Sequence, residues 1–256
     1  ELVASLRGGL AVATDGRVEG DDALSVEGPV AIDSRRVTPG CLFVAIPGEH
    51  VDGHDYVEAA LEGGAVATLA TRAVPGPHVI VADPVRALGR LAADRLASLR
   101  SETDLRVVAI TGSQGKTSVK DLVAHVLRTE GATVAPEGSF NNELGVPLTV
   151  LRADAGTRHL VLEMGARGIG HIATLCEIAP PDVSVVLNVG TAHAGEFGGL
   201  DRTAQAKGEL LEALDEHGTA VLNADDERVA AMASRTRGRV LTFGRAGQVR
   251  LVGDVT

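Results

Sequence analysis

The residues with the clearest chemistry lie between positions 111 and 118, which read Thr-Gly-Ser-Gln-Gly-Lys-Thr-Ser. Glycines let backbone N–H groups approach a phosphate, a lysine reaches its outer oxygens, and a following threonine hydroxyl can bind Mg²⁺. This spacing predicts a phosphate-binding loop in which Lys116 and Thr117 have those roles. Ile110 stands five residues before Gly115, where the full pattern has a glycine. The alternative interpretation is a glycine-rich turn with a surface lysine.

A strand before this loop and a helix after it are needed to hold it in place. Residues 107–110 form an apolar, mostly β-branched run, which indicates a buried strand. After the loop, apolar residues recur with the helical period until Gly131, at Val119, Leu122, Val123, Val126 and Leu127. A loop between such elements lies at a helix N-terminus, where free N–H groups and the helix dipole attract an anion.

Composition limits the classes of protein that need to be considered. The chain has 256 residues, 45% of them hydrophobic and 2% aromatic, so two domains can pack around Ala, Val and Leu. A spanning apolar run of about 18 residues and a leader pattern are both lacking, which predicts a cytoplasmic protein without membrane insertion. Cys41 and Cys176 form no Cys-x-x-Cys pair, which favours reduced thiols. A net charge of −10 without a basic stripe argues against nucleic acid as a partner.

Residues 1–103 are interpreted as a small N-terminal α/β domain. Strands are expected near 30–32, 41–46, 65–70 and 78–82, with helices near 59–61 and 85–99. Two loops in this domain have polar residues at strand ends, Ser34-Arg35 and Glu49 to His54, and open α/β sheets bind ligands at strand ends. The alternative is that Arg35 caps a strand and the histidines are solvated.

Residues 104–256 alternate strands and helices, which predicts a mostly parallel sheet with helices on both faces. After the phosphate-loop helix, strands are expected at 133–135, 159–163, 182–188, 220–223, 239–243 and 249–252. Helices are expected at 202–214 and 226–233.

Two further residues stand at or after strand ends of this second domain, at the edge where the phosphate loop is expected. Glu163 ends one strand, and His193 follows another. A carboxylate at this edge can bind Mg²⁺ directly or through water, although a strand-end salt bridge is the simpler alternative. A lone histidine is not a usual Mg²⁺ ligand. Lys207 reads, from its spacing alone, as an ordinary solvated helix lysine.

Several segments together resemble the Mur ligase family. They are residues 111–118, Asn141 to Thr149, Glu163 to Ala166, Asp33 to Arg35, Pro39 to Ala45 and Asp52 to His54. The resemblance covers roughly residues 30–225 and is strongest to the branch that adds D-alanyl-D-alanine to UDP-N-acetylmuramoyl-tripeptide. A sister branch, which adds diaminopimelate, has threonines where this chain has Asn142 and Glu143.

The resemblance implies a set of site residues. The ATP-binding residues would be Gly112, Ser113, Gln114, Gly115, Lys116, Thr117 and Ser118. Thr117 and Glu163 would bind the first of two Mg²⁺ ions, with His193 near the pair. Lys207 would be carbamylated by CO₂ and bind the second ion, and Lys116, Lys207 and His193 would be catalytic. The substrate-binding residues would be Ser34, Arg35, Glu49, His50 and Val51 for the UDP part, and Asn141 and Asn142 for the muramoyl part.

The implied fold is α/β: a small UDP-binding domain, 1–103, followed by a mostly parallel-sheet P-loop-type ATPase domain, 104–256, truncated before a third domain. The implied enzyme is a monomeric ATP-dependent amide ligase that proceeds through an acyl phosphate, and this part alone is expected to be inactive. The alternatives are a diaminopimelate- or lysine-adding Mur ligase and a nucleotide-binding fragment without turnover. A folate-polyglutamate ligase and a small-molecule kinase share parts of this chemistry.

Overall fold

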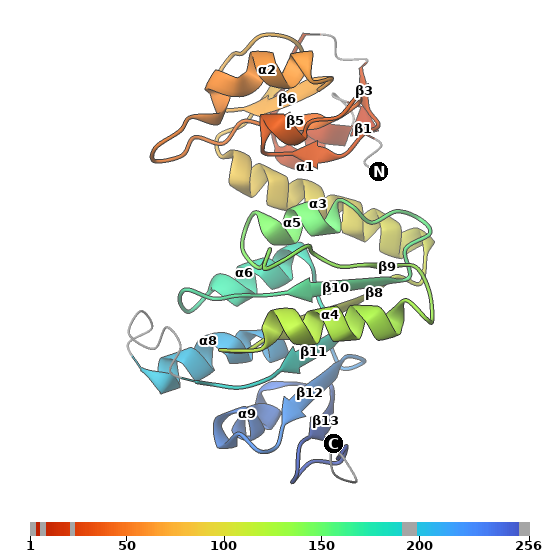
Figure 1. Ribbon diagram of the computed structural model, residues 1–256, viewed down its shortest axis with the longest axis vertical. Helices are drawn as coiled ribbons and strands as arrows, with labels where there is room; N and C mark the ends of the chain where they lie inside the picture. The colour runs from red at the N-terminus through yellow and green to blue at the C-terminus, as the bar shows by residue number, and fades with distance from the viewer. Residues whose placement is uncertain (1–3, 6–8, 21–23, 191–198, 251–256) are drawn as a thin grey trace. The chain divides into compact units, whose positions relative to one another are not determined.

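The computed structural model describes residues 4–5, 9–20, 24–190 and 199–250. The chain divides into two compact units, each built on its own sheet (Figure 1). The first unit comprises Glu1–Thr103 and Pro147–Gly156, and the second comprises Asp104–Val146 and Thr157–Thr256. Residues 147–156 therefore group with the first unit by their contacts. Among the described residues, no helix is both long and apolar enough to cross a membrane.

The first unit contains a five-stranded sheet in the order β2-β7-β6-β5-β4, parallel except for β2. Its strands are β2 (Arg17–Glu19), β4 (Val30–Ala31), β5 (Leu42–Val44), β6 (Ala67–Ala70) and β7 (His78–Ile80). β1 (Ala4–Ser5) pairs antiparallel with β3 (Ser25–Val26). Every residue of β5 and β6 is buried, as expected for central strands of a parallel sheet.

The described part of this unit includes the helices α1 (Ala11–Thr14), α2 (Val57–Glu62) and α3 (Pro84–Glu102). α3 begins at a strong N-cap, because the Asp83 carboxylate accepts the N–H groups of Val85 at 2.9 Å and Arg86 at 3.1 Å. Pro84 occupies the first helical position, where a missing N–H group has no cost. The helix that the sequence predicts over 85–99 is confirmed.

The second unit contains a six-stranded sheet that is parallel throughout, in the order β13-β12-β11-β8-β10-β9. Its strands are β8 (Arg106–Thr111), β9 (Thr133–Val134), β10 (His159–Glu163), β11 (Val183–Val186), β12 (Thr219–Asn223) and β13 (Arg239–Phe243). Its helices are α4 (Lys116–Leu127), α6 (His171–Ile178), α8 (Leu200–Glu212) and α9 (Glu227–Ala231); α5 (Gly145–Val150) follows the loop after β9. The predicted parallel sheet is confirmed.

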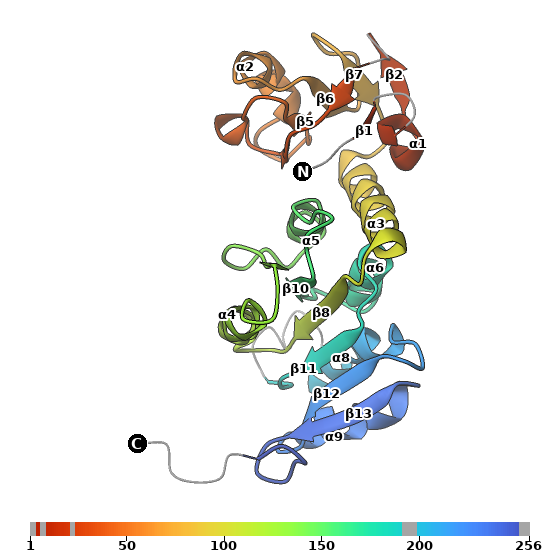
Figure 2. The ribbon, with the colours of Figure 1, turned by 90° about the vertical axis from the view of Figure 1, so that its right-hand side faces the viewer.

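Helices cover both faces of this sheet, also as predicted (Figure 2). On one face, Val119 and Val123 of α4 pack against Val108 and Ile110 of β8. On the other face lies α8, because the Ser184 hydroxyl of β11 donates to the carbonyl oxygen of Leu210 at 2.9 Å. The predicted phosphate loop therefore lies between β8 and α4, at the carboxyl edge of the sheet. α8 packs on the face of the sheet opposite to α4.

Some details differ from the sequence predictions. The apolar period predicts Leu122 and Val126 within the packed stripe of α4, but they are 65% and 62% exposed. They form the adjacent helical row, which faces away from the packed residues. α5 and α6 were not predicted, because each is short and begins after glycine-containing loops. In the described part of the predicted strand 249–252, Val249 forms an isolated bridge to Phe243, and residues 251–256 lie outside the described residues.

Candidate functional site

The predicted phosphate loop lies between β8 and α4, with its lysine folded back over it. Gly115 has φ of +79°, a left-handed conformation that suits glycine, and precedes the first turn of α4. The Lys116 ammonium donates to the carbonyl oxygen of Gly112 at 2.9 Å. The first-turn N–H groups of α4 have no helical carbonyl to bind, so this end of the helix can accept an anion.

Hydrogen bonds to Asn188, which follows β11, hold the first half of this loop in place. Its side-chain oxygen accepts the N–H groups of Ser113 and Gln114, each at 3.0 Å, and its amide donates to the carbonyl of Gln114 at 3.1 Å. The Ser113 hydroxyl accepts the N–H of Gly190 at 2.8 Å. Two of the predicted ATP-binding residues therefore use their N–H groups within the protein, and those from Gly115 onward remain for phosphate. Sequence reasoning missed Asn188, although it stands at the end of a predicted strand.

A buried carboxylate and its polar partners lie beside the first turn of α4. The Thr117 hydroxyl donates to one oxygen of Glu163 at 2.8 Å, and the Asn141 amide donates to the other at 2.7 Å. The Ser139 hydroxyl lies 3.2 Å from that of Thr117. Glu163, at the end of β10, is 1% exposed, so it is a buried carboxylate whose two oxygens are both hydrogen-bonded. The structure thus brings together three predicted site residues and adds Ser139.

These donors suit a magnesium ion that also binds a nucleotide. Hydroxyl and carboxylate oxygens are its preferred protein ligands, and it keeps several waters or phosphate oxygens. Within the described ranges, no group of three or more His, Cys, Asp and Glu side chains forms a closed metal cage. An ion held mainly by phosphate and water needs only the few oxygens found here. His193, the remaining predicted neighbour of the metals, lies outside the described residues.

Lys207 is not the solvated lysine that its spacing suggested. Its side chain projects from α8 and is 4% exposed. Burial, and to a smaller extent the positive charge of Lys116, lowers its pKa to about 8. Among the residues that the structure describes, Lys207 has no hydrogen-bond acceptor and no acidic partner. The neutral amine is therefore far more accessible here than in an ordinary lysine.

The two residues after Lys207 hold α8 against its neighbours. The Glu209 carboxylate accepts the N–H groups of Gly170 at 2.6 Å and Ala173 at 3.0 Å, at the start of α6. Gly208 leaves room for the guanidinium of Arg235, which a β-carbon at this position would overlap. The sequence around Lys207 therefore combines a buried amine with two contacts that fix its helix.

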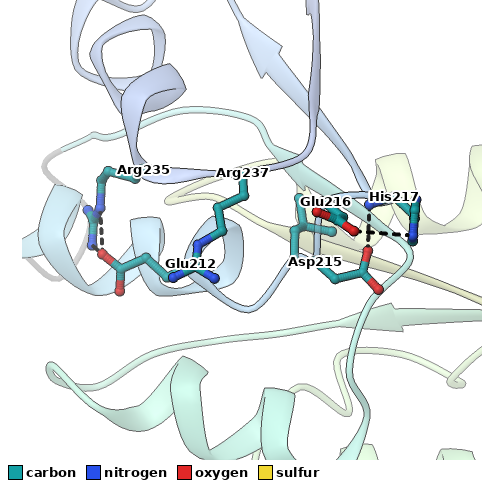
Figure 3. A pocket seen from close by; sticks show the side chains of 7 residues that line it. Glu212, Asp215, Glu216, His217, Arg235 and Arg237 are labelled. Atoms are coloured by element: carbon teal, nitrogen blue, oxygen red, sulfur yellow. Dashed lines mark hydrogen bonds and ion pairs between the residues drawn. The ribbon is translucent and has the colours of Figure 1, made fainter.

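Arg235 lies in the short 3-10 helix Met232–Arg235, after α9, and contacts α8 from there. It donates to the carbonyl oxygens of Ala204 at 3.1 Å and Gln205 at 2.9 Å, and to the Glu212 carboxylate at 2.8 and 3.0 Å. Arg235 and Glu212 also line a surface pocket of about 550 Å³ (Figure 3). The pocket is lined by Glu212, Leu214, Asp215, Glu216, His217, Arg235 and Arg237. None of these is a predicted site residue.

In the first unit, Ser34 and Arg35 lie in a one-turn 3-10 helix capped by Asp33. The Asp33 carboxylate accepts the Arg35 N–H at 3.0 Å and its guanidinium at 2.8 and 2.9 Å. These hydrogen bonds lower the pKa of Asp33 to about 2. Arg35 is exposed, and its described contacts are with Asp33 rather than with a strand end, so they differ from the strand cap that the sequence offered as the alternative to ligand binding.

The second predicted loop is a short turn with an exposed tip. Pro47 and Asp52 form an antiparallel bridge that closes it. Its tip residues are Glu49, His50 and Val51, all exposed.

At the base of this turn, His54 is buried rather than solvated. The Asp52 carboxylate lies 2.5 Å from His54 Nδ1 and 2.9 Å from the guanidinium of Arg72. On its other side, His54 Nε2 accepts the N–H of Thr71 at 3.0 Å. Sequence reasoning missed the role of His54, which is to hold the turn against the end of β6.

Comparison with family models matches both units. Residues 110–254 match the Mur ligase middle domain, and residues 29–95 match the Mur ligase family catalytic domain. A curated relative, UDP-N-acetylmuramoyl-tripeptide–D-alanyl-D-alanine ligase of Mycobacterium tuberculosis, is 48% identical over 241 residues, which is 86% of this chain and 47% of the relative.

Two solved structures are similar across nearly the same range. MurF from Acinetobacter baumannii is 31% identical with a TM-score of 0.87, covering 97% of this chain and 55% of that one. MurF ligase from Thermotoga maritima in complex with ADP is 37% identical with a TM-score of 0.77, covering 87% of this chain and 51% of that one. This chain spans about half the length of the curated relatives it matches. The family model that covers residues 110–254 shows that the chain belongs to the Mur ligase family.

Proposed function

We propose that this chain is the UDP-sugar- and ATP-binding part of a ligase that adds D-alanyl-D-alanine to UDP-N-acetylmuramoyl-tripeptide. The observation that carries the proposal is the hydrogen-bonded group of Thr117, Glu163 and Asn141 beside the phosphate loop. The printed names of the relatives support the choice of substrates. The first unit, within residues 1–103, would bind the UDP part, and residues 104–256 would bind ATP.

In this proposal, the N–H groups from Gly115 to Ser118 bind the outer phosphates of ATP. Lys116 leaves the carbonyl of Gly112 and pairs with a phosphate oxygen. Thr117 and Glu163 would hold Mg²⁺, which supplies positive charge against the phosphates. The tripeptide carboxylate attacks the γ-phosphorus, which releases ADP and forms an acyl phosphate. The amine of D-alanyl-D-alanine then displaces phosphate and loses a proton as the amide forms. Positioning and charge stabilisation are what these residues contribute.

Lys207 would carry the carbamate in this site. CO₂ adds to a neutral amine and releases one proton, so the lowered pKa of Lys207, about 8 through burial and the charge of Lys116, favours the reaction. The product is an anion, which replaces repulsion between Lys207 and the nearby Lys116 with attraction. It would also offer carboxylate-like oxygens to a second Mg²⁺.

The substrate residues are proposed from the family resemblance. Ser34, Arg35, Glu49, His50 and Val51 would contact the uridine diphosphate. Asn141 and Asn142 would contact the muramoyl group, from a segment that already touches Glu163.

Asn142 itself accepts the N–H groups of Leu144 at 3.3 Å and Gly145 at 3.0 Å. Its side-chain oxygen therefore also shapes the start of α5.

A diaminopimelate- or lysine-adding ligase remains the second candidate. A threonine at position 142 or 143, typical of the diaminopimelate-adding branch, is absent from this chain.

Ligand retention by the 256-residue chain tests the proposal. In equilibrium dialysis, labelled UDP-N-acetylmuramoyl-tripeptide is expected to be retained and dihydrofolate is not. Lys116→Ala is expected to lose binding of Mg²⁺-ATP and keep the UDP ligand, since the lysine lies in the second unit. Retention of folate without UDP-peptide would overturn the proposal and favour a folate-type ligase. Retention of the UDP ligand without any nucleotide would overturn the ATP-binding role.

A further inference from the structure

A second lysine in α4 is buried deeply without belonging to the predicted site. Lys120 is 1% exposed and stands one helical turn after Lys116. Its ammonium donates to the carbonyl oxygens of Pro136 at 2.7 Å and Gly138 at 3.2 Å, and lies 2.8 Å from the Asp121 carboxylate. A buried ammonium is unfavourable unless it is hydrogen-bonded, and here the two inward acceptors belong to one short loop.

That loop delivers side chains to the metal side of the site. Ser139 directly follows the anchored carbonyl of Gly138 and lies 3.2 Å from the Thr117 hydroxyl. Asn141, two residues later, donates to Glu163 at 2.7 Å. The loop has no regular secondary structure of its own, so its position depends on such contacts.

Another described contact fixes the loop at its far end. The carbonyl of Asn141 accepts the N–H of Gly165 at 2.8 Å, just after β10. A β-carbon at Gly165 would press against the Asn141 side chain, so the two segments approach closely. Lys120 holds the loop at residues 136 and 138, and Gly165 holds it at Asn141. Ser139 lies between these two points.

We propose that Lys120 is a positioning residue for the metal side of the nucleotide site. By binding the carbonyls of residues 136 and 138, it places Ser139 and Asn141 against Thr117 and Glu163. α4 then carries three successive functions: Lys116 for phosphate, Thr117 for the metal and Lys120 for the loop that orients the metal ligands. This inference rests on the proposed function, because it assigns a metal to that cluster.

The test separates metal-dependent from metal-free nucleotide binding. ATP affinity is measured by calorimetry on the 256-residue chain, once with Mg²⁺ and once with EDTA. Replacement of a group that orients metal ligands typically weakens metal affinity about ten- to a hundredfold. Lys120→Met is therefore expected to lose most of the gain in affinity that Mg²⁺ gives the wild type, while its metal-free affinity stays within about twofold.

Two matched variants and a second measurement control this test. Asp121→Asn changes the exposed partner of Lys120 and is expected to behave as the wild type. Lys120→Gln keeps a donor for one carbonyl and is expected to recover part of the Mg²⁺ effect, and it replaces the methionine variant if that one does not fold. Hydrogen exchange without metal is expected to accelerate at residues 139–145 in Lys120→Met and to remain unchanged around Asn188.

The outcomes distinguish the inference from the proposed function. No nucleotide binding by the wild type would overturn the proposed function and the inference with it. Mg²⁺-enhanced binding that is unchanged in Lys120→Met would overturn the inference alone. Equal loss of affinity with and without Mg²⁺ in both Lys120 variants would also overturn it, because that result indicates a general structural role.

Discussion

Lys120 and Lys207 are both buried in the same unit, but their surroundings differ in kind. Lys120 has three oxygen acceptors within hydrogen-bonding or ion-pair distance. Lys207 has none among the described residues, and burial together with the charge of Lys116 lowers its pKa to about 8. A buried amine with acceptors stabilises the fold as an ammonium, whereas one without them is held ready to lose its proton.

The distribution of cations strengthens this contrast. The chain has only three lysines, Lys116, Lys120 and Lys207, and its remaining basic side chains at neutral pH are arginines. Arginine keeps its proton in proteins, while lysine can lose it when buried. All three lysines lie on α4 or α8, the two helices that carry the candidate site. Counting acceptors around each buried lysine thus separates a structural role from a chemical one.

The largest expected effect is on stability when Lys120 loses its ammonium. Lys120→Met leaves two buried carbonyl oxygens without a donor, and each unsatisfied group costs about 1–3 kcal/mol. We expect the free energy of unfolding to fall by about 4 kcal/mol, measured by urea denaturation. Asp121→Asn should change it by less than about 1 kcal/mol, because that carboxylate is largely exposed. An unchanged stability in Lys120→Met would contradict the structural role.

Replacing Lys207 by methionine should instead raise the free energy of unfolding. Its folded pKa is about 8, below the ordinary 10.5, so the unfolded chain binds more protons between these values. The free energy of unfolding therefore rises with pH across this window, and the full destabilisation by the buried ammonium is present below pH 8. We expect Lys207→Met to be about 3 kcal/mol more stable than the wild type at pH 7 in CO₂-free buffer, from about 1.4 kcal/mol per pKa unit.

This advantage of Lys207→Met should shrink as the pH rises from 8 to 10.5. Urea denaturation at several pH values measures it. A methionine variant that is less stable than the wild type at pH 7 would show that Lys207 has a stabilising partner and would remove the contrast with Lys120.

A smaller effect is expected when the packing behind Lys207 is changed. Gly208→Ala would displace the Arg235 guanidinium, which ends a flexible side chain, and break its hydrogen bonds to α8. We expect a loss of about 1–2 kcal/mol in the free energy of unfolding. Arg237→Ala, in the same pocket, is the matched control and should have almost no effect. Thermal melting of both variants measures the difference, and equal melting temperatures would contradict the role given to Arg235.

The smallest effect concerns the influence of Lys116 on Lys207. Burial is the main cause of the lowered pKa of Lys207, and the charge of Lys116 is the second. Lys116→Met should therefore raise the pKa of Lys207 by less than about one unit. NMR of ¹³C-labelled lysine can follow each side chain, since the chain has so few. A rise to the ordinary value would show that charge, rather than burial, controls Lys207.

The sequence predicted the parts of this molecule that follow from local pattern. The period of apolar residues gave the parallel sheet, and strand ends placed Glu163 at the same edge as Thr117. Lys207 could be selected only through the family resemblance, because burial on α8 depends on packing that spacing does not report.

Lys120, Asn188 and Arg235 could not be found from local pattern. Their acceptors or donors are mostly main-chain groups at distant positions, 16 to 18 residues away for Lys120 and about 75 for Asn188. Main-chain carbonyls and N–H groups occur at every residue, so their use leaves no signal in residue types.

The contacts of Asn188 have a consequence for the speed of nucleotide exchange. Because Ser113 and Gln114 are already hydrogen-bonded to its side chain, the front of the phosphate loop is ordered before any ligand arrives. Such preorganisation reduces the conformational entropy that binding must remove. Association of an anion with this loop should then depend on collision and orientation rather than on ordering of the first half of the loop. With two donors withheld from the anion, we expect this loop to favour rapid exchange over tight retention.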